Sequence, residues 1–409
     1  MKRDPKAPDA SPGRKRGGRD VKRLALVFGG VLAAVVVVLV LAGGGRAAGA
    51  LGDAWSNWTS SLQDSAAEIP NLRIDEQRAL EATDSLLLMV TDDSGKATSL
   101  ALLAASPSDE ATLALIPPGL FAILPGYGDF ALADATVFEG PELTALTISN
   151  SLGVRIDHVA VIPQSAIPTI VPSPMTISLP SALEVDEEGG TRTILVSNGE
   201  VQVSAADVAL LLTTEGIGGQ LDWLQRQAAV WSAIFAAMAD DADIPEAIAA
   251  TVDGSGSRVT GLLADASAVD PQVTIVPVTR VSVSGTDDAF SLDIDLAEAF
   301  VARRMPHLQL SETGRPRVEI LNGNGRVLTT RAVAEALIRN GFYVVRTDNA
   351  DNFEYQGTLV VSQGRDNRVD AERALNLLAT GELLLELRAP SGVVDISIIV
   401  GHDIPAGEG

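Results

Sequence analysis

Three apolar segments separated by short polar turns form the clearest pattern in the first half of the chain. The segments are Ser85–Thr91, Thr98–Ala105 and Ala111–Ile116, and the sequences DDSGKA and SPSDE separate them. Short apolar runs bounded by Gly, Pro, Ser and Asp are typical of strands joined by hairpins. Because nearly every position in these runs is apolar, the pattern predicts a sheet that is covered on both faces.

Helical and strand patterns alternate after these segments. A helix over Pro141–Leu152 is expected to end at Gly153, and a strand over Ile156–Ile162 follows it. Residues 163–200 are rich in Pro, Ser, Asp and Gly, which predicts an irregular excursion or a hairpin. The later expectations are helices over Val208–Leu212 and Leu221–Ala239 and a returning strand over Val273–Val283. The longer helix is amphipathic, and its apolar side is expected to hold Leu221, Leu224, Ala228, Trp231, Ile234 and Phe235.

Residues 314–403 alternate more tightly between strand and helix patterns, after a boundary sequence SETGRP at 311–316. The expected order is a strand and turn (Arg317–Gly325), a helix (327–340), two strands (342–346 and Gly357–Ser362), a helix (370–379) and a closing strand (Val393–Gly401). Such short alternation predicts a small open sheet with helices packed on it. The fold class expected for the chain is therefore α/β.

The amino-terminal residues carry a different signal. Residues 1–23 hold nine Lys or Arg and three Asp, whereas the rest of the chain holds 21 basic and 50 acidic residues. Residues 24–42 then run for 19 positions without a charge. At about 1.5 Å per residue they span about 28 Å, enough to cross a bilayer. The positive-inside rule predicts one transmembrane helix, with the basic tail cytoplasmic and the bulk of the chain extracytoplasmic, after a linker at 43–71.

Composition excludes several functions. The chain has no Cys, and its three His residues are far apart in the sequence, so a thiol nucleophile, a zinc site and a Ser-His-Asp triad have no support. The acidic exported part argues against nucleic-acid binding, and the basic tail is expected to touch anionic lipid headgroups. A cleaved signal peptide is the alternative to an anchor, although the apolar run exceeds the usual signal-peptide core.

Two regions resemble a known family. Residues 314–403, with VEILNGNG, AVAEALIRNGFYVV and ISIIVGHD, closely resemble the LytR C-terminal domain that follows LytR-CpsA-Psr (LCP) domains in actinobacterial envelope proteins. Residues 72–306 are similar, more distantly, to the LCP domain itself, through TDSLLLMV and LGVRIDHVAVI. The pair Arg226-Gln227 is similar to a late Arg-Gln pair of the family. The resemblance implies an α/β/α domain with a central mixed sheet.

The resemblance also implies a chemistry. Active members move a glycopolymer from a polyprenyl-pyrophosphate carrier to peptidoglycan; arginines hold the pyrophosphate, Asp residues hold magnesium, and an apolar cavity holds the lipid. The family's key strand ends in Ser-Ile-Pro-Arg-Asp. Here the strand ends in Leu-Ile followed by Pro117, Pro118 and Gly119, so both the Arg and the Asp are missing. Pro118 also lacks a backbone N–H.

Few cations remain to replace the missing arginine. Between residues 79 and 300 the basic residues are Lys96, Arg155, Arg192, Arg226, Arg258 and Arg280. The candidates for residual phosphate or lipid-headgroup contacts are Asp84, Arg155, Arg226 and Gln227. Asp84 is also the candidate magnesium ligand, aided by Asp92 or Asp93; the alternative is an Asp at a strand start and an Asp pair in a turn. For Arg226-Gln227, the alternative is the solvated edge of a helix.

Two hypotheses follow for function. The leading hypothesis is a catalytically degenerate LCP-like envelope protein without a cofactor. It would act as a binding or scaffolding factor in cell-wall assembly, and its partner would be a polyprenyl-phosphate lipid, a glycopolymer or another protein. The alternative is an active, magnesium-dependent phosphotransferase that uses Asp84, Arg155 and Arg226. Transcriptional attenuation conflicts with the expected topology, because the folded domains are expected outside the cell.

Overall fold

The structure of the chain is a computed structural model. It describes residues 84–105, 110–187, 190–252, 256–283, 286–312, 314–326, 329–386 and 392–405. The tail at 1–23, the expected transmembrane helix at 24–42 and the linker at 43–71 lie outside the described residues. Among the helices that are described, none is long and apolar enough to span a bilayer.

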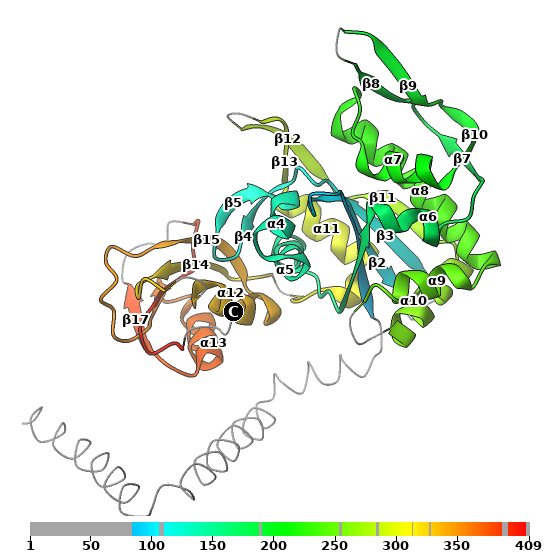
Figure 1. The fold of residues 1–409 in the computed structure, drawn as a ribbon. Helices are drawn as coiled ribbons and strands as arrows, with labels where there is room; N and C mark the ends of the chain where they lie inside the picture. Colours follow the sequence, from blue (N-terminus) through cyan, green and yellow to red (C-terminus); the bar gives the residue numbers. More distant parts are fainter. Residues whose placement is uncertain are drawn as a thin grey trace, which may run out of the picture. The chain divides into compact units, whose positions relative to one another are not determined.

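A mixed five-stranded sheet forms the centre of the larger domain, with the strand order β11-β3-β2-β1-β6 (Figure 1). Strand β2 is antiparallel to β1 and β3, whereas β6 and β11 are parallel to their neighbours. The strands are β1 (Ser85–Thr91), β2 (Ala97–Ala105), β3 (Ala111–Ile116), β6 (His158–Pro163) and β11 (Gln272–Ile275). The predicted α/β class with a central mixed sheet is confirmed.

Alternation along β1 explains why both faces of this sheet are buried. Leu86, Leu88 and Val90 belong to one apolar core, and Leu87 and Met89 belong to the core on the opposite face. Successive side chains of a strand point to opposite faces, so a strand that is apolar at every position needs helices on both. The arrangement is therefore three layers, helices on sheet on helices.

Two sets of helices form the outer layers (Figure 1). The first face is covered by α6 (Ile167–Ile170), α7 (Ala205–Thr213), α8 (Gly219–Asp240), α9 (Asp243–Ala249) and α10 (Gly256–Ala268). The second face is covered by α5 (Pro141–Leu152) and α11 (Ile294–Arg304). A short helix, α4 (Ala135–Glu139), and 3-10 turns at Leu132–Asp134, Gln164–Ala166 and Pro306–Leu308 connect the elements.

Four two-stranded hairpins or ribbons lie outside the central sheet. They pair β4 (Phe121–Leu124) with β5 (Gly128–Ala131), β7 (Met175–Leu179) with β10 (Gly199–Val203), β8 (Leu183–Asp186) with β9 (Arg192–Val196), and β12 (Val278–Val283) with β13 (Thr286–Leu292). Two expectations need correction here. The strand predicted over Val273–Val283 is two strands, because the chain leaves the sheet at Val276-Pro277. Leu221, assigned to the apolar side of α8, is 39% exposed.

The second sheet has the order β15-β14-β18-β16-β17 and carries two helices. Its elements are β14 (Arg317–Asn322), α12 (Thr329–Arg339), β15 (Tyr343–Asn349), β16 (Leu359–Gln363), α13 (Arg368–Leu378), β17 (Glu382–Glu386) and β18 (Ile396–Val400). One core contains alternate residues of the strands, such as Val318 and Ile320, together with Leu337 of α12 and Ala374 of α13. The predicted small open sheet is observed, with β17 as a strand that the sequence pattern did not suggest.

Residues 82–409 form a single compact unit. Within it, buried contacts join the domain of the first sheet to the domain of the second sheet. Asn150 of α5 is 1% exposed; its Nδ2 donates to the carbonyl of Val344 at 2.8 Å, and its Oδ1 accepts from the Val344 amide at 2.9 Å. Arg331 of α12 lies 2.9 Å from a Glu139 carboxylate oxygen. A buried amide that satisfies both backbone groups of one residue fixes β15 against α5.

Candidate functional site

The predicted site residues fall at two opposite edges of the central sheet. Strands β1, β3 and β6 run in one direction, so their carboxyl ends meet at one edge, which we call the carboxyl edge. The other, where β1 begins at Ser85 and β6 begins at His158, we call the amino edge. Pro117–Gly119, Arg226 and Gln227 belong to the carboxyl edge, whereas Asp84 and Arg155 belong to the amino edge.

The turn after β3 is packed and hydrogen-bonded at the carboxyl edge. Pro118 is buried, and its carbonyl accepts from the amide of Ala133 at 2.9 Å. The amide of Gly119 donates to Oε1 of Gln220 at 3.0 Å, and the Gly119 carbonyl accepts from Phe290 at 3.2 Å. Both backbone groups of Gly119 are thus used within the protein. This turn offers an anion neither a cation nor a free amide from Gly119.

Arg226 of α8 is buried, with 1% of its surface exposed. Its Nη1 donates to Oγ of Ser181 at 3.1 Å and to the carbonyl of Ala182 at 3.4 Å, and its Nη2 donates to the carbonyl of Glu215. Burial lowers the pKa of Arg226, and the charges of Asp222 and Glu215 offset part of that effect. The interpretation of Arg226 as a solvated helix edge is therefore wrong: the guanidinium ties the loops before β8 and after α7 to α8.

Gln227 and Trp231 connect α8 to the start of β2. Nε2 of Gln227 donates to the carbonyls of Thr98, at 3.0 Å, and Leu212, at 3.1 Å. The indole of Trp231 donates to Oγ of Ser99 at 3.1 Å. The Nε2 of Gln227 and the indole N–H of Trp231 thus have protein partners, whereas Oε1 of Gln227 is buried without a hydrogen-bond partner among the described residues. The solvated-edge interpretation of Gln227 is wrong too, because the side chain is fully buried.

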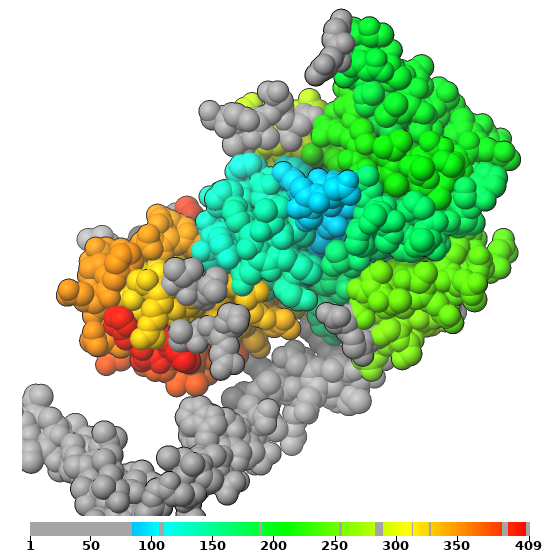
Figure 2. Space-filling model, in the orientation of Figure 1, coloured from blue at the N-terminus to red at the C-terminus, as the bar shows by residue number. Residues whose placement is uncertain are grey.

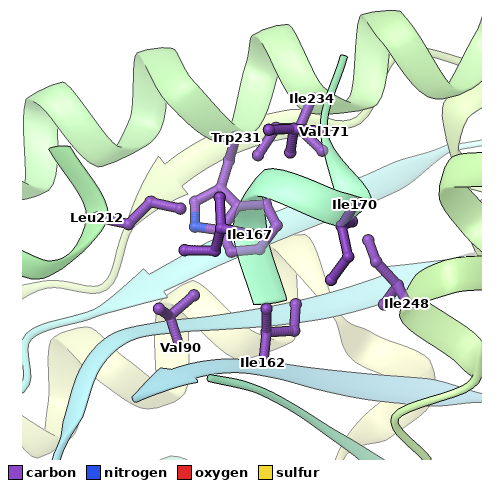
Figure 3. A pocket seen from close by; sticks show the side chains of 9 residues that line it. All are labelled: Val90, Ile162, Ile167, Ile170, Val171, Leu212, Trp231, Ile234 and Ile248. Atoms are coloured by element: carbon purple, nitrogen blue, oxygen red, sulfur yellow. The ribbon is translucent and has the colours of Figure 1, made fainter. Parts of the chain in front are cut away.

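An apolar pocket lies beside these residues, between α8 and the sheet (Figure 3). Its lining side chains are all apolar: Val90, Ile162, Ile167, Ile170, Val171, Leu212, Trp231, Ile234 and Ile248. The Trp231 side chain points from α8 toward the strands and fills the space between the helix and the sheet, as Figure 3 shows. The remaining cavity is about 10 Å³. That is about the smallest volume that holds one water molecule, and it is far too small for a polyprenyl chain.

Asp84 sits at the amino edge with two basic neighbours. Its Oδ2 lies 3.4 Å from Nε of Arg258 on α10 and 3.8 Å from Nε2 of His158 at the start of β6. The Arg258 side chain is 69% exposed, so this ion pair is largely solvated. Neither Arg258 nor His158 was among the site candidates predicted from the sequence. The position of His158 opposite Leu86 follows from the parallel pairing of β1 with β6.

Arg155 lies at the same edge and is engaged by Asp157. Nε of Arg155 is 2.7 Å from Oδ1 of Asp157, and Oδ2 of Asp157 accepts from the amide and the hydroxyl of Ser85, each at 3.0 Å. His307 is a further neighbour. Burial and the charge of Arg155 lower the pKa of His307, although a backbone hydrogen bond at Ala105 opposes this. The network fastens the loop before β6 to the start of β1.

The residues do not fit a magnesium site. Asp84 precedes β1 and Asp92 follows it; eight steps at about 3.3 Å separate them by about 26 Å, so they cannot share an ion. Oδ1 of Asp92 accepts from the Ser94 amide and hydroxyl, at 2.8 and 2.6 Å, and from the Lys96 amide at 3.0 Å. These bonds cap the β1–β2 turn, drawn in blue in Figure 2. The described residues contain no group of three His, Cys, Asp or Glu side chains that could hold a metal.

The structure thus brings Asp84 and Arg155 together and keeps them apart from Arg226 and Gln227. Sequence reasoning missed Gln220, which occupies the Gly119 amide, and Ser181, which accepts from Arg226. The sequence offered a clue to Gln220, because this residue lies in the first turn of the helix that carries Arg226 and Gln227. Ser181 had none, since it lies in a stretch without periodicity.

The comparisons with known proteins give one matching family model and several similar solved structures. Residues 315–403 match the family model described as LytR cell envelope-related transcriptional attenuator. No curated protein sequence matches the chain. Among solved structures, B. subtilis TagV is 15% identical, with a TM-score of 0.46, and the match covers 56% of this chain and 98% of TagV. The LytR-Csp2A-Psr enzyme from Actinomyces oris is 21% identical, with a TM-score of 0.43 and coverage of 55% and 90%.

A third similar structure is TagT bound to LI-WTA, at 18% identity and a TM-score of 0.45, with 55% of this chain and 90% of that chain covered. The predicted resemblance is confirmed in these terms. Residues 315–403 match the LytR C-terminal family model, and the solved structures to which the chain is similar include a LytR-Csp2A-Psr enzyme.

Proposed function

We propose that this chain is a catalytically degenerate LCP-type protein of the cell envelope, which acts as a scaffold in cell-wall assembly. The LytR C-terminal domain supports the envelope assignment. The observation that carries the degenerate part is the state of Arg226. The two terminal nitrogens of its guanidinium donate to Ser181, Ala182 and Glu215. Two further cations at this edge also face protein groups: Lys96 pairs with Asp134 at 2.8 Å, and the Arg280 guanidinium lies 5.9 Å from the ring centroid of Phe290.

The chemistry of phosphoryl transfer supports this proposal. A pyrophosphate bears several negative charges, and arginines or metal ions must face its oxygens to stabilise the transition state. At the carboxyl edge, Pro118 replaces the cation expected from the family pattern, and Gly119 has its amide bound to Gln220. The adjoining apolar cavity has room for about one water molecule. Scaffolding through protein contacts is therefore favoured over retained binding of lipid.

We further propose that residues 24–42 anchor the chain in the cytoplasmic membrane. The basic tail at 1–23 would then face the cytoplasm, and the two domains would lie outside, where glycopolymer and peptidoglycan are assembled. The alternative, a magnesium-dependent glycopolymer phosphotransferase, needs Asp84 and Arg226 to act on one substrate. Those residues lie at opposite edges of the sheet.

Lipid capture tests the proposal. The full chain is purified from membranes in mild detergent, and bound lipids are extracted and identified by mass spectrometry. We expect no polyprenyl phosphate above the amount carried by an unrelated single-span protein prepared alongside. Stoichiometric polyprenyl phosphate that is lost in Arg226→Gln and retained in Arg192→Gln, an exposed control, would contradict it.

Complementation supplies a second test that does not depend on purification. A cell lacking this chain is given the wild type, Asp84→Asn or Arg155→Gln, and wall-linked glycopolymer and cell shape are measured. If the protein is a scaffold, the amino edge has no catalytic task and these substitutions should be tolerated. We therefore expect both variants to complement as well as the wild type when the protein levels are equal. Failure of Asp84→Asn at normal abundance would favour the phosphotransferase.

A further inference from the structure

A groove of about 260 Å³ runs between strand β11 and helix α11, and the candidate site uses none of its residues. Ile275 and Pro277 line the side next to the strand. Leu296 and Phe300 line the helix side, and Arg303 belongs to the same lining. The groove is many times larger than the cavity beside Trp231 and could hold more than a water molecule.

The strand side of the groove has an open backbone edge. Among the described strands, β11 is the last of its sheet and pairs only with β3. The amide of Val276 donates to the Leu115 carbonyl of β3 at 3.0 Å. In a parallel ladder the inward-bonding residues alternate, so Thr274 also faces β3, whereas the backbone groups of Val273 and Ile275 face outward. Such an edge is a template for another strand.

The helix side supplies apolar surface and positive charge. Leu296 is 56% exposed, an unusual position for a large aliphatic side chain, and Phe300 forms a buried floor. Arg303 is exposed, and Arg304 lies beside it with its Nη1 on Oε1 of Gln272. The residues lining the groove include both arginines and no carboxylate. Apolar contact combined with two guanidinium groups selects a ligand that is partly apolar and carries a carboxylate.

We propose that this groove binds an extended peptide segment of a partner protein, which adds to β11 as an extra strand. The segment's backbone pairs with Val273 and Ile275, an apolar side chain rests on Leu296 and Phe300, and a carboxylate meets Arg303 and Arg304. Addition of an extended peptide to an exposed sheet edge is a recurrent mode of peptide recognition, in which main-chain hydrogen bonds give affinity and side-chain pockets give specificity. The proposal concerns a different surface from the carboxyl edge, and it stands whether or not that edge is catalytic.

A pair of labelled peptides tests it with the full chain in detergent. The first probe is fluorescein-Ser-Thr-Val-Thr-Val-Asp with a free carboxyl terminus; the second is the same peptide ending in Asn amide, without negative charge at that end. Fluorescence anisotropy should show at least tenfold weaker binding of the second peptide. Arg303→Glu should weaken the first peptide at least tenfold, and Arg192→Glu, a charge reversal at an exposed site in β9, should leave its affinity unchanged.

Two further measurements identify the binding mode. Ile275→Pro removes an outward N–H and keeps the inward bonds to β3, as proline on an edge strand does, and it should abolish binding. Addition of the acidic peptide should also slow amide hydrogen exchange at Val273 and Ile275 in the wild type, a readout that needs no variant. Equal affinity for both peptides, or unchanged binding in Arg303→Glu, overturns the proposal. So does competition by a fatty acid without slowed exchange in β11, because that result indicates an amphiphile site.

Discussion

Two charged groups at opposite edges of the central sheet, Arg226 and the Asp84–Arg258 pair, differ in how they are held. At the carboxyl edge, Arg226 is 1% exposed and bonded to carbonyl and hydroxyl oxygens. At the amino edge, Asp84 and Arg258 form a pair in which the arginine side chain is 69% exposed. The buried charge holds loops together, whereas the exposed pair is solvated and contributes little.

The difference separates a charge that is held within the fold from a charge that faces solvent. A cation that serves a ligand must leave its donors pointing into a space that the ligand can enter. The terminal nitrogens of Arg226 and the Nε2 of Gln227 donate to protein oxygens, the Nε of Arg226 has no hydrogen-bond partner among the described residues, and Trp231 fills the adjoining space (Figure 3). Changes at Arg226 and Trp231 should therefore alter stability, whereas a change to the solvated pair of Asp84 and Arg258 should be mild.

The largest effect is expected for Trp231→Ala. Removing a buried aromatic side chain from this core should cost about 3–5 kcal/mol of unfolding free energy. Denaturant unfolding of the full chain measures it, with Val137→Ala, at a site that is 60% exposed, as the control. A loss below about 1 kcal/mol, the range of surface changes, would mean that the pocket is not packed as Figure 3 shows.

Arg226→Met should have the next largest effect. It keeps most of the apolar stem and leaves the carbonyls of Ala182 and Glu215 without their donor, which should cost about 2–4 kcal/mol. The matched control is Arg192→Met, whose side chain is 66% exposed and should change stability by less than about 0.5 kcal/mol. Equal stability of the two variants in the same unfolding measurement would show that Arg226 is free for a ligand.

Acidification should weaken the amino edge. Burial and the charge of Arg155 lower the pKa of His307 below its usual 6.5. In the unfolded chain the imidazole takes up a proton as the pH falls through about 6.5, while the folded chain resists it, so this contribution to stability is present at pH 8 and lost below 6.5. Unfolding at pH 8 and pH 5.5 measures the loss, which should shrink in His307→Gln. An equal loss of unfolding free energy in His307→Gln would mean that other titratable groups cause the pH dependence.

The smallest effect is expected for Asp84→Asn. Its partner Arg258 is largely solvated, and the charge of such a pair is worth less than about 1 kcal/mol. The same unfolding measurement in 1 M salt should abolish even this difference, because exposed charges are screened. A cost comparable to that of Arg226→Met would erase the contrast between the two edges.

Part of this account could be predicted from the sequence, and particular residues show why. The apolar runs at Ser85–Thr91 and Ala111–Ile116 are strands with the predicted bounds, since an apolar hairpin pattern leaves few alternatives. Gly153 ends α5 in the left-handed conformation, at a φ of 69°. The absence of a cation at Pro118, relative to the family pattern, stays a prediction from the sequence, which rests on the lack of any donor in proline.

The arrangement of the candidate residues could not be predicted in the same way. Asp84 and Arg226 each looked available as isolated residues, and only the strand directions place them at opposite edges. The burial of Arg226 depends on Ala182 and Glu215, which approach α8 from loops without periodicity. The split at Val276-Pro277 depends on a proline whose effect on a strand varies with its position at the edge.

The most direct test of the central claim is turnover at the carboxyl edge. The full chain in detergent is incubated with a polyprenyl-pyrophosphate-linked glycan, peptidoglycan and Mg²⁺, and released polyprenyl phosphate is quantified by mass spectrometry. The account predicts release no faster than in the same mixture without protein, for the wild type and for Arg226→Gln alike. Magnesium-dependent release by the wild type that Arg226→Gln abolishes, with the variant still folded, would contradict it.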